Sequence, residues 1–149
     1  MRRSSNTAST NALALICLAI FFILVFTACS RKVYFASSSV VPAAEGSVKM
    51  KKDHNGNHVI EVTVKNLVEA RKLQTPGSIY MVWIDTETYG TKNLGQLKSS
   101  SGLFSSTLKA SLKAVSAFKP VRVYITLERN NDAMYPGQTI VLTTGYLRT

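Results

Sequence analysis

From Ser47 onward, the sequence is a series of short segments in which apolar and polar residues alternate. Turn-forming residues separate these segments about every ten positions. Alternation with a period of two places the apolar side chains on one face of a β-strand. The segment 58–67, HVIEVTVKNL, is the clearest example, with Ile60, Val62 and Val64 on the apolar face. The pattern predicts an all-β fold stabilised by a packed apolar core.

Further strands are predicted by the same alternation or by β-branched and aromatic content. They lie at 46–53, 78–88, 92–100, 118–130 and 138–147. Segment 103–116 is ambiguous: its apolar spacing fits a helix, whereas its alternation and its Ser and Thr residues favour a strand. About seven strands without a long helix indicate an antiparallel β-sandwich of immunoglobulin type over residues 47–149. The apolar run 80–84 predicts a strand covered on both sides, with Trp83 anchoring the core.

The chain begins with a cationic start and an uncharged apolar run. Arg2 and Arg3 precede a polar stretch, and residues 12–28 carry no charge. This order is typical of a secretory signal. A membrane-spanning helix needs about 20 apolar residues, with a range of roughly 17 to 25, so the run is short for a permanent span. Three outcomes remain open, namely a lipoprotein signal, an uncleaved single-pass anchor helix, or plain secretion.

Phe26-Thr27-Ala28-Cys29 resembles the bacterial lipobox, in which small residues precede a lipidated cysteine. The resemblance implies that residues 1–28 are a lipoprotein signal peptide and that Cys29 becomes the acylated N-terminus. We therefore expect a membrane contact through lipid on Cys29 and a domain in the cell envelope facing the periplasm or the exterior. Residues 29–46 are predicted to be a tether, with 33–35 and 40–41 contributing an edge strand. No cysteine follows Cys29, so the folded part has no disulfide.

The chain is strongly basic, with 18 Lys and Arg against 8 Asp and Glu, a formal net charge of +10. Loss of residues 1–28 removes only two cations and leaves +8. This bias suggests an anionic surface, a glycan or an envelope protein as partner, or cations spread for solubility. No nucleic-acid-binding motif is present, which argues against nucleic acid. A basic strip is expected from Lys49, Lys51, Lys65 and Lys92; such a strip also protects an edge strand from pairing.

The two histidines, His54 and His58, flank a predicted hairpin turn. A three-residue loop at 55–57 would pair Met50 with Val62 and place His54 opposite His58. Two facing imidazoles are weak candidates for a metal site, because zinc needs three or four protein ligands. A solvated turn is the favoured interpretation, and no cofactor is predicted.

Motifs of hydrolases, metalloproteases and nucleotide-binding loops are absent from the sequence. Asp85 and Glu87 alternate near a strand end, where carboxylates more often cap an exposed edge than catalyse a reaction. Glu128 is expected to pair with Arg122, and the serines at 99–101 are expected in a loop. The sequence therefore predicts a protein that is not an enzyme.

Residues 76–142 resemble the extracytoplasmic C-terminal domain of anti-sigma-K factors. The matching pieces are YMVWIDTE, NLGQLKSSSGLF and VRVYITLERNNDAMYPGQTIVL. They include a Trp strand, a T-x-E strand end and a Pro-Gly turn, where the family has Pro-x-Gly. The resemblance implies a sandwich fold. The family's cytoplasmic sigma-binding domain has no counterpart in the residues before the apolar run, so an envelope lipoprotein with a binding or structural module is expected first. An envelope stress or anti-sigma-type regulator on an uncleaved helix is the alternative.

Overall fold

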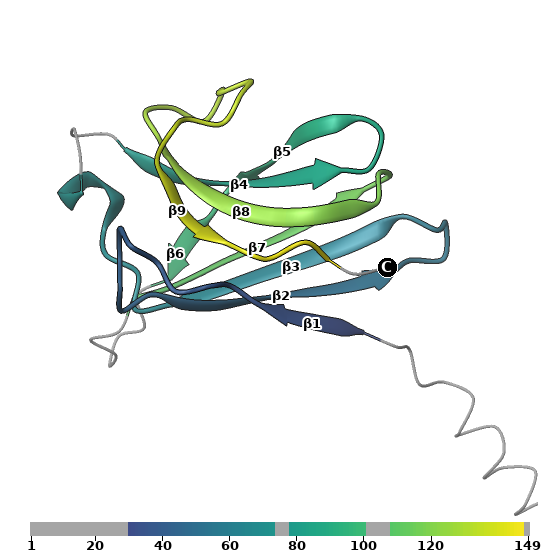
Figure 1. Ribbon diagram of the computed structural model, residues 1–149, viewed down its shortest axis with the longest axis horizontal. Coiled ribbons are helices and arrows are strands. Elements are labelled where there is room, and N and C mark those ends of the chain that lie inside the picture. The colour runs from purple at the N-terminus through teal and green to yellow at the C-terminus, as the bar shows by residue number, and fades with distance from the viewer. Residues whose placement is uncertain (1–29, 74–77, 101–107, 148–149) are drawn as a thin grey trace, which may run out of the picture.

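The computed structural model describes residues 30–73, 78–100 and 108–147, which form two antiparallel β-sheets packed face to face (Figure 1). The five-stranded sheet has the order β1 (Arg31–Tyr34), β2 (Glu45–Lys52), β3 (His58–Lys65), β7 (Lys109–Ser116), β6 (Lys98–Ser100). The four-stranded sheet has the order β5 (Gly90–Gln96), β4 (Ile79–Thr86), β8 (Pro120–Glu128), β9 (Ile140–Thr143). One 3-10 turn, Ala70–Lys72, precedes β4. The predicted all-β fold is confirmed.

The predicted N-terminal signal or anchor helix and its lipidation residue, Cys29, lie outside the described residues. Within the described ranges, the only helical element is the 3-10 turn. No helix there has the length and hydropathy to span a bilayer.

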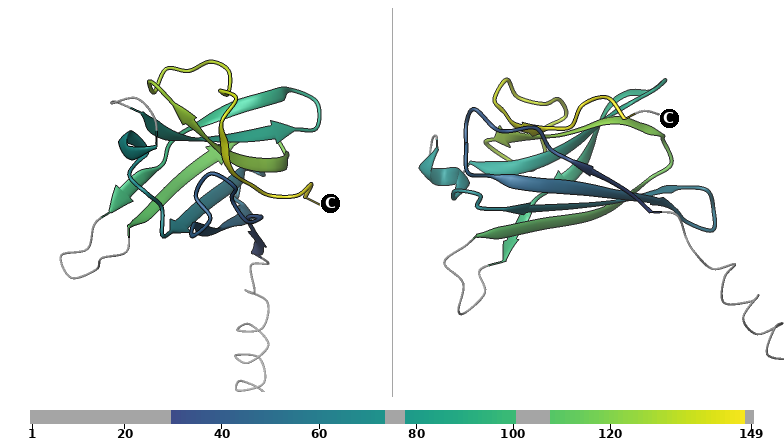
Figure 2. Two further views of the ribbon diagram at one scale, coloured as in Figure 1. Left: turned by 60° about the vertical axis from the view of Figure 1, so that its left-hand side comes forward. Right: turned by 60° about the horizontal axis from the view of Figure 1, so that its bottom comes forward.

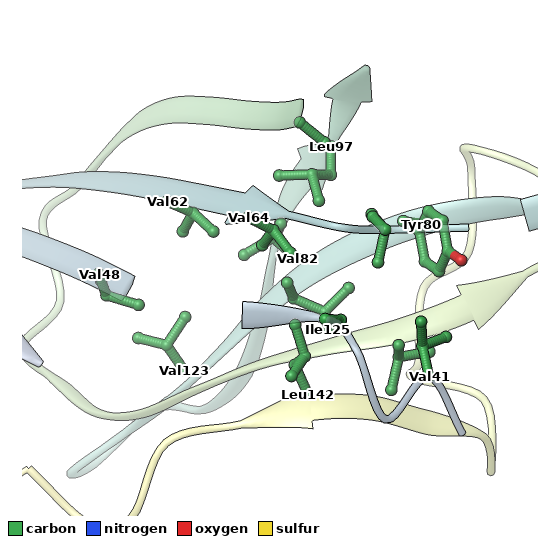
Figure 3. Packing of buried hydrophobic residues seen from close by; sticks show 14 of the residues in the cluster. Val41, Val48, Val62, Val64, Tyr80, Val82, Leu97, Val123, Ile125 and Leu142 are labelled. Atoms are coloured by element: carbon green, nitrogen blue, oxygen red, sulfur yellow. The ribbon is translucent and has the colours of Figure 1, made fainter. Parts of the chain in front are cut away.

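The main core lies between the two sheets. Val48, Val62 and Val64 face Val82, Ile125 and their neighbours, and each is at most 1% exposed (Figure 3). These residues occupy every second position of their strands, as the alternation predicts. Burying each such side chain stabilises the fold by about 1.5–3 kcal/mol.

A second, smaller apolar cluster lies on the outer face of the four-stranded sheet. It contains Met81, Trp83 and Tyr124, and Ala133 of the β8–β9 loop packs against it. Asn93 Nδ2 also donates a hydrogen bond of 2.9 Å to the Ala133 carbonyl and so fastens the loop. The prediction that β4 is covered on both sides is confirmed. Trp83 is fully buried and anchors this second cluster and not the main core, because Val82 and Ile84 point inward and Trp83 therefore points outward.

The segment predicted as a tether is part of the fold. β1 pairs with β2, Val33 lying opposite Val48, and forms the edge strand expected there. Val41 is only 3% exposed and packs into the core, although it is not in a strand. Phe35 N donates to Gly46 O at 3.0 Å, and Ala36 N donates to Thr143 O at 2.9 Å in the other sheet. The predicted domain start at Ser47 is therefore too late, and the described fold begins at Arg31.

The described residues form nine strands instead of about seven, partly because segment 92–100 contains two strands. β5 pairs in one sheet and β6 in the other, and buried Leu97 between them donates its N–H to Tyr80 O at 2.9 Å. Ser99 and Ser100 belong to β6, so their predicted loop assignment is wrong. The favoured strand is confirmed over Lys109–Ser116, while 101–107 lies outside the described residues.

Candidate anionic-ligand surface

The outer face of the five-stranded sheet carries most of the net positive charge of the described residues. Residues opposite one another in register share a face, and Val48 points into the core, so Lys49 and its register partners point outward. We call this surface the lysine face. Its charged residues are Lys32, Lys49, Lys51, Lys65, Lys98, Lys109, Lys113, Glu45 and Glu61. All seven lysines are exposed, and only two glutamates accompany them.

The positive charge of the lysine face is uneven. Lys113 forms an ion pair with Glu61 at 3.1 Å, and Lys65 lies opposite Glu45 in the pairing of β2 with β3. Among the described residues, Lys49 and Lys51 have no ion pair. Lys32 Nζ lies 4.9 Å from the centre of the Tyr34 ring. Among the described residues, Lys32, Lys51, Lys98 and Lys109 therefore have neither an ion pair nor a glutamate opposite them, and they favour an anionic ligand.

The expected basic strip is correct in part. Lys49, Lys51 and Lys65 lie on one face, whereas Lys92 is on β5 of the other sheet, 5.5 Å from the Phe118 ring centre. The sequence reasoning missed the lysines of β1, β6 and β7. The alternation of Lys109, Ser111 and Lys113 in a segment predicted as a strand was the signal that could have placed the β7 lysines on one face.

The hairpin that carries the histidines has the predicted faces but a different register. Lys52 lies opposite His58, and Met50 opposite Ile60, so His54 is not opposite His58. Asp53 sets this loop: its carboxylate accepts N–H bonds from Asn55 and Asn57, both at 2.9 Å, and Asp53 N donates to Asn57 O. Gly56 takes a positive φ of 80°, which suits glycine. The three-residue loop is therefore 54–56 and not 55–57.

His58 lies beside the cations Lys52 and Lys119. Partial burial, followed by the positive charges of Lys52 and Lys119, lowers the pKa of His58. In the described parts of the chain, no three His, Cys, Asp or Glu residues group in a way that would hold a metal ion.

The candidate carboxylates each have a separate partner. Asp85 accepts hydrogen bonds from Arg122 Nε at 2.8 Å and from the Thr91 hydroxyl at 2.7 Å. Glu87 pairs with Lys119 at 3.2 Å on the exposed β4–β5 turn. The pairing expected between Glu128 and Arg122 is wrong, since Arg122 pairs with Asp85. Asp85 therefore pairs across two neighbouring strands, opposite Arg122, whereas Glu87 pairs at a turn.

Glu128 belongs to a network with Trp83. Trp83 Nε1 donates to the Thr126 hydroxyl at 2.7 Å, and that hydroxyl donates to Glu128. Gly137 N donates to the same carboxylate at 2.7 Å. This network joins the Trp strand, the T-x-E strand end and the Pro-Gly turn, which are the features of the anti-sigma-K resemblance. These residues therefore have a structural role.

Comparison with known proteins does not identify a ligand for this surface. No family model, curated protein or solved structure matches the chain.

Proposed function

We propose that this protein is a non-enzymatic binding module of the bacterial cell envelope, held at a membrane by lipid on Cys29. It presents the lysine face to a partner that carries phosphate or carboxylate groups. The observation that carries the proposal is the presence of seven exposed lysines and two glutamates on one sheet face. We further infer that the sandwich is of the immunoglobulin type.

Several features support this function over catalysis. Asp85 and Glu87 form ion pairs, and Asp53 closes the hairpin loop. The lysine face, by contrast, is broad and lies on regular strands, which suits recognition of a repeating or extended anionic partner. The lipobox-like residues before Cys29 add the membrane attachment.

The attachment is tested by metabolic labelling with palmitate and by the mass of the mature N-terminal peptide. We expect label on the wild type, a diacylglycerol-modified Cys29 and loss of both in Cys29→Ala. An intact Met1 on the mature protein would contradict the lipid anchor.

The binding is tested with full-length protein in neutral phosphatidylcholine vesicles and two soluble probes, polyphosphate and polyglutamate. Replacement of Lys49, Lys51 and Lys109 by Gln should remove most of the binding. A matched control removes three cations from outside the lysine face, at Lys72, Lys92 and Arg129, and should bind nearly as well as the wild type. Equal losses in both variants would show that net charge alone is responsible.

A regulator of the anti-sigma type on an uncleaved anchor helix is the second candidate, which the resemblance over 76–142 favours. Co-purification with a transmembrane signalling protein would support it over the binding module.

A further inference from the structure

The position at which the fold begins constrains how the domain sits on its membrane. Arg31 is already paired with β2, and only Ser30 separates it from Cys29. Two residues span at most about 7 Å when extended. A domain anchored at Cys29 therefore has almost no tether, and the surface around Arg31 must lie at the height of the lipid headgroups.

The surface around Arg31 is one end of the β1–β2 margin. Arg31 lies opposite Met50, and Lys32 opposite Lys49. β2 then continues through Lys51 and Lys52 into the hairpin loop. The start of β1 and the β2–β3 turn lie at the same end of the sandwich, as Figures 1 and 2 show. We call Lys32, Lys49, Lys51 and Lys52 the basic corner.

The basic corner has four lysines and only two acids beside it, Asp53 next to Lys52 in the chain and Glu61 opposite Lys49. All four lysines are exposed, and no ion pair to them exists among the described residues. The nearest acid in sequence, Asp53, is engaged with Asn55 and Asn57 of its own loop. The glutamate of the central row, Glu61, is paired with Lys113. Lysines held close to an anionic leaflet are attracted to it.

We propose that the basic corner rests on anionic phospholipid headgroups, so that the margin of β1 and β2 faces the bilayer. Lys65 and Lys109, at the far end of the five-stranded sheet, then remain accessible to other partners. The inference rests on the proposed function only in its need for an anchor that ends at Cys29. A lipid and an uncleaved span satisfy this need equally.

The test is a lysine footprint of the full-length protein, purified from membranes and reconstituted in vesicles. One set of vesicles is phosphatidylcholine, and the other contains about 30% phosphatidylglycerol to supply negative surface charge. A membrane-impermeant amine reagent labels the lysines, and peptide mass spectrometry gives the rate at each. The anionic lipid should slow labelling of the basic corner about fivefold, as expected for charges at the surface. Lys65 and Lys109 should react at unchanged rates.

A paired set of variants separates the corner from total charge. Lys51→Gln with Lys52→Gln should abolish the protection of Lys32 and Lys49. Lys65→Gln with Lys109→Gln removes the same charge from the far end and should leave that protection intact.

Other footprints would overturn the proposal. Equal rates at all lysines in both vesicles would mean that no surface rests on the lipid. Slower labelling of Lys92 on β5 instead would mean that the sandwich stands on its four-stranded sheet side. If either labelling pattern occurs while Cys29 is acylated, the lipid anchor is supported and the contact of the basic corner with the headgroups is refuted. If the protein does not float with the vesicles, both the anchor and the contact are refuted.

Discussion

At the scale of single residues, the hydrogen bond from the Trp83 indole to the Thr126 hydroxyl shows how one polar atom supports the second apolar cluster. Both Trp83 and Thr126 are fully buried, so the indole N–H depends on the Thr126 oxygen. Thr126→Val keeps the shape but leaves that donor without an acceptor, at a cost of about 1–3 kcal/mol in the free energy of unfolding. Thr126→Ser keeps the hydroxyl and should cost less. Urea unfolding followed by Trp83 fluorescence gives both values, and equal losses would contradict the role of the hydrogen bond.

The pH dependence of stability belongs to His58. Its pKa in the folded protein is below the ordinary value of 6.5, because burial and two lysines disfavour the charged form. The unfolded chain therefore binds the proton more readily, so stability is lost as pH falls from above 6.5 through the lowered pKa. The melting temperature should fall between about pH 7.5 and about pH 5.5, and His58→Gln should flatten that fall. His54→Gln, in the exposed loop, is the control; a profile unchanged by His58→Gln would refute the assignment.

At the scale of elements, Gly46 tests whether the N-terminal segment is truly part of the sandwich. A Cβ on Gly46 would lie 2.9 Å from both the Phe35 ring and Thr63 O. Gly46→Ala must therefore displace the chain after β1 or strain β3, at a cost of about 1–3 kcal/mol. Gly145→Ala is the matched control, since a Cβ there has no neighbour within 4 Å. Thermal unfolding compares the two, and a neutral Gly46→Ala would favour the tether predicted from the sequence.

The same elements show how far local pattern reaches. Alternation assigns the correct faces to β2 and β3, because burial of Val48, Val62 and Val64 requires them. It does not give the register, since Asp53 closes the loop through contacts that no periodicity reports. It also presents Tyr124 and Thr126 as a polar face of β8, although both are buried. The β8–β9 loop packs against this cluster through Ala133, and alternation within β8 does not report that packing.

At the scale of the whole molecule, the lysine face depends on strand order. Lys49 and Lys51 are predictable from alternation within β2 alone. Lys109 and Lys113 join them only because β7 pairs with β3, a contact between segments about fifty residues apart that short-range patterns do not encode. Lys92 was misplaced for the same reason, because its strand belongs to the other sheet. Charge gathered from separate strands thus becomes a surface only when the topology is known.

The short connection to the anchor leads to a prediction for the whole molecule. Insertion of about eight Gly and Ser residues after Ser30 would give the domain a flexible span of roughly 16 Å. In the wild type, the short connection itself holds the basic corner near the lipid. Labelling of the corner should therefore stay partly slower than that of Lys65 and Lys109 at about 1 M salt, where charges are screened beyond about 3 Å. In the insertion variant only charge attraction remains, and salt should restore full labelling. The footprint in low and high salt measures this, and identical salt responses in the two proteins would show that the connection does not orient the domain.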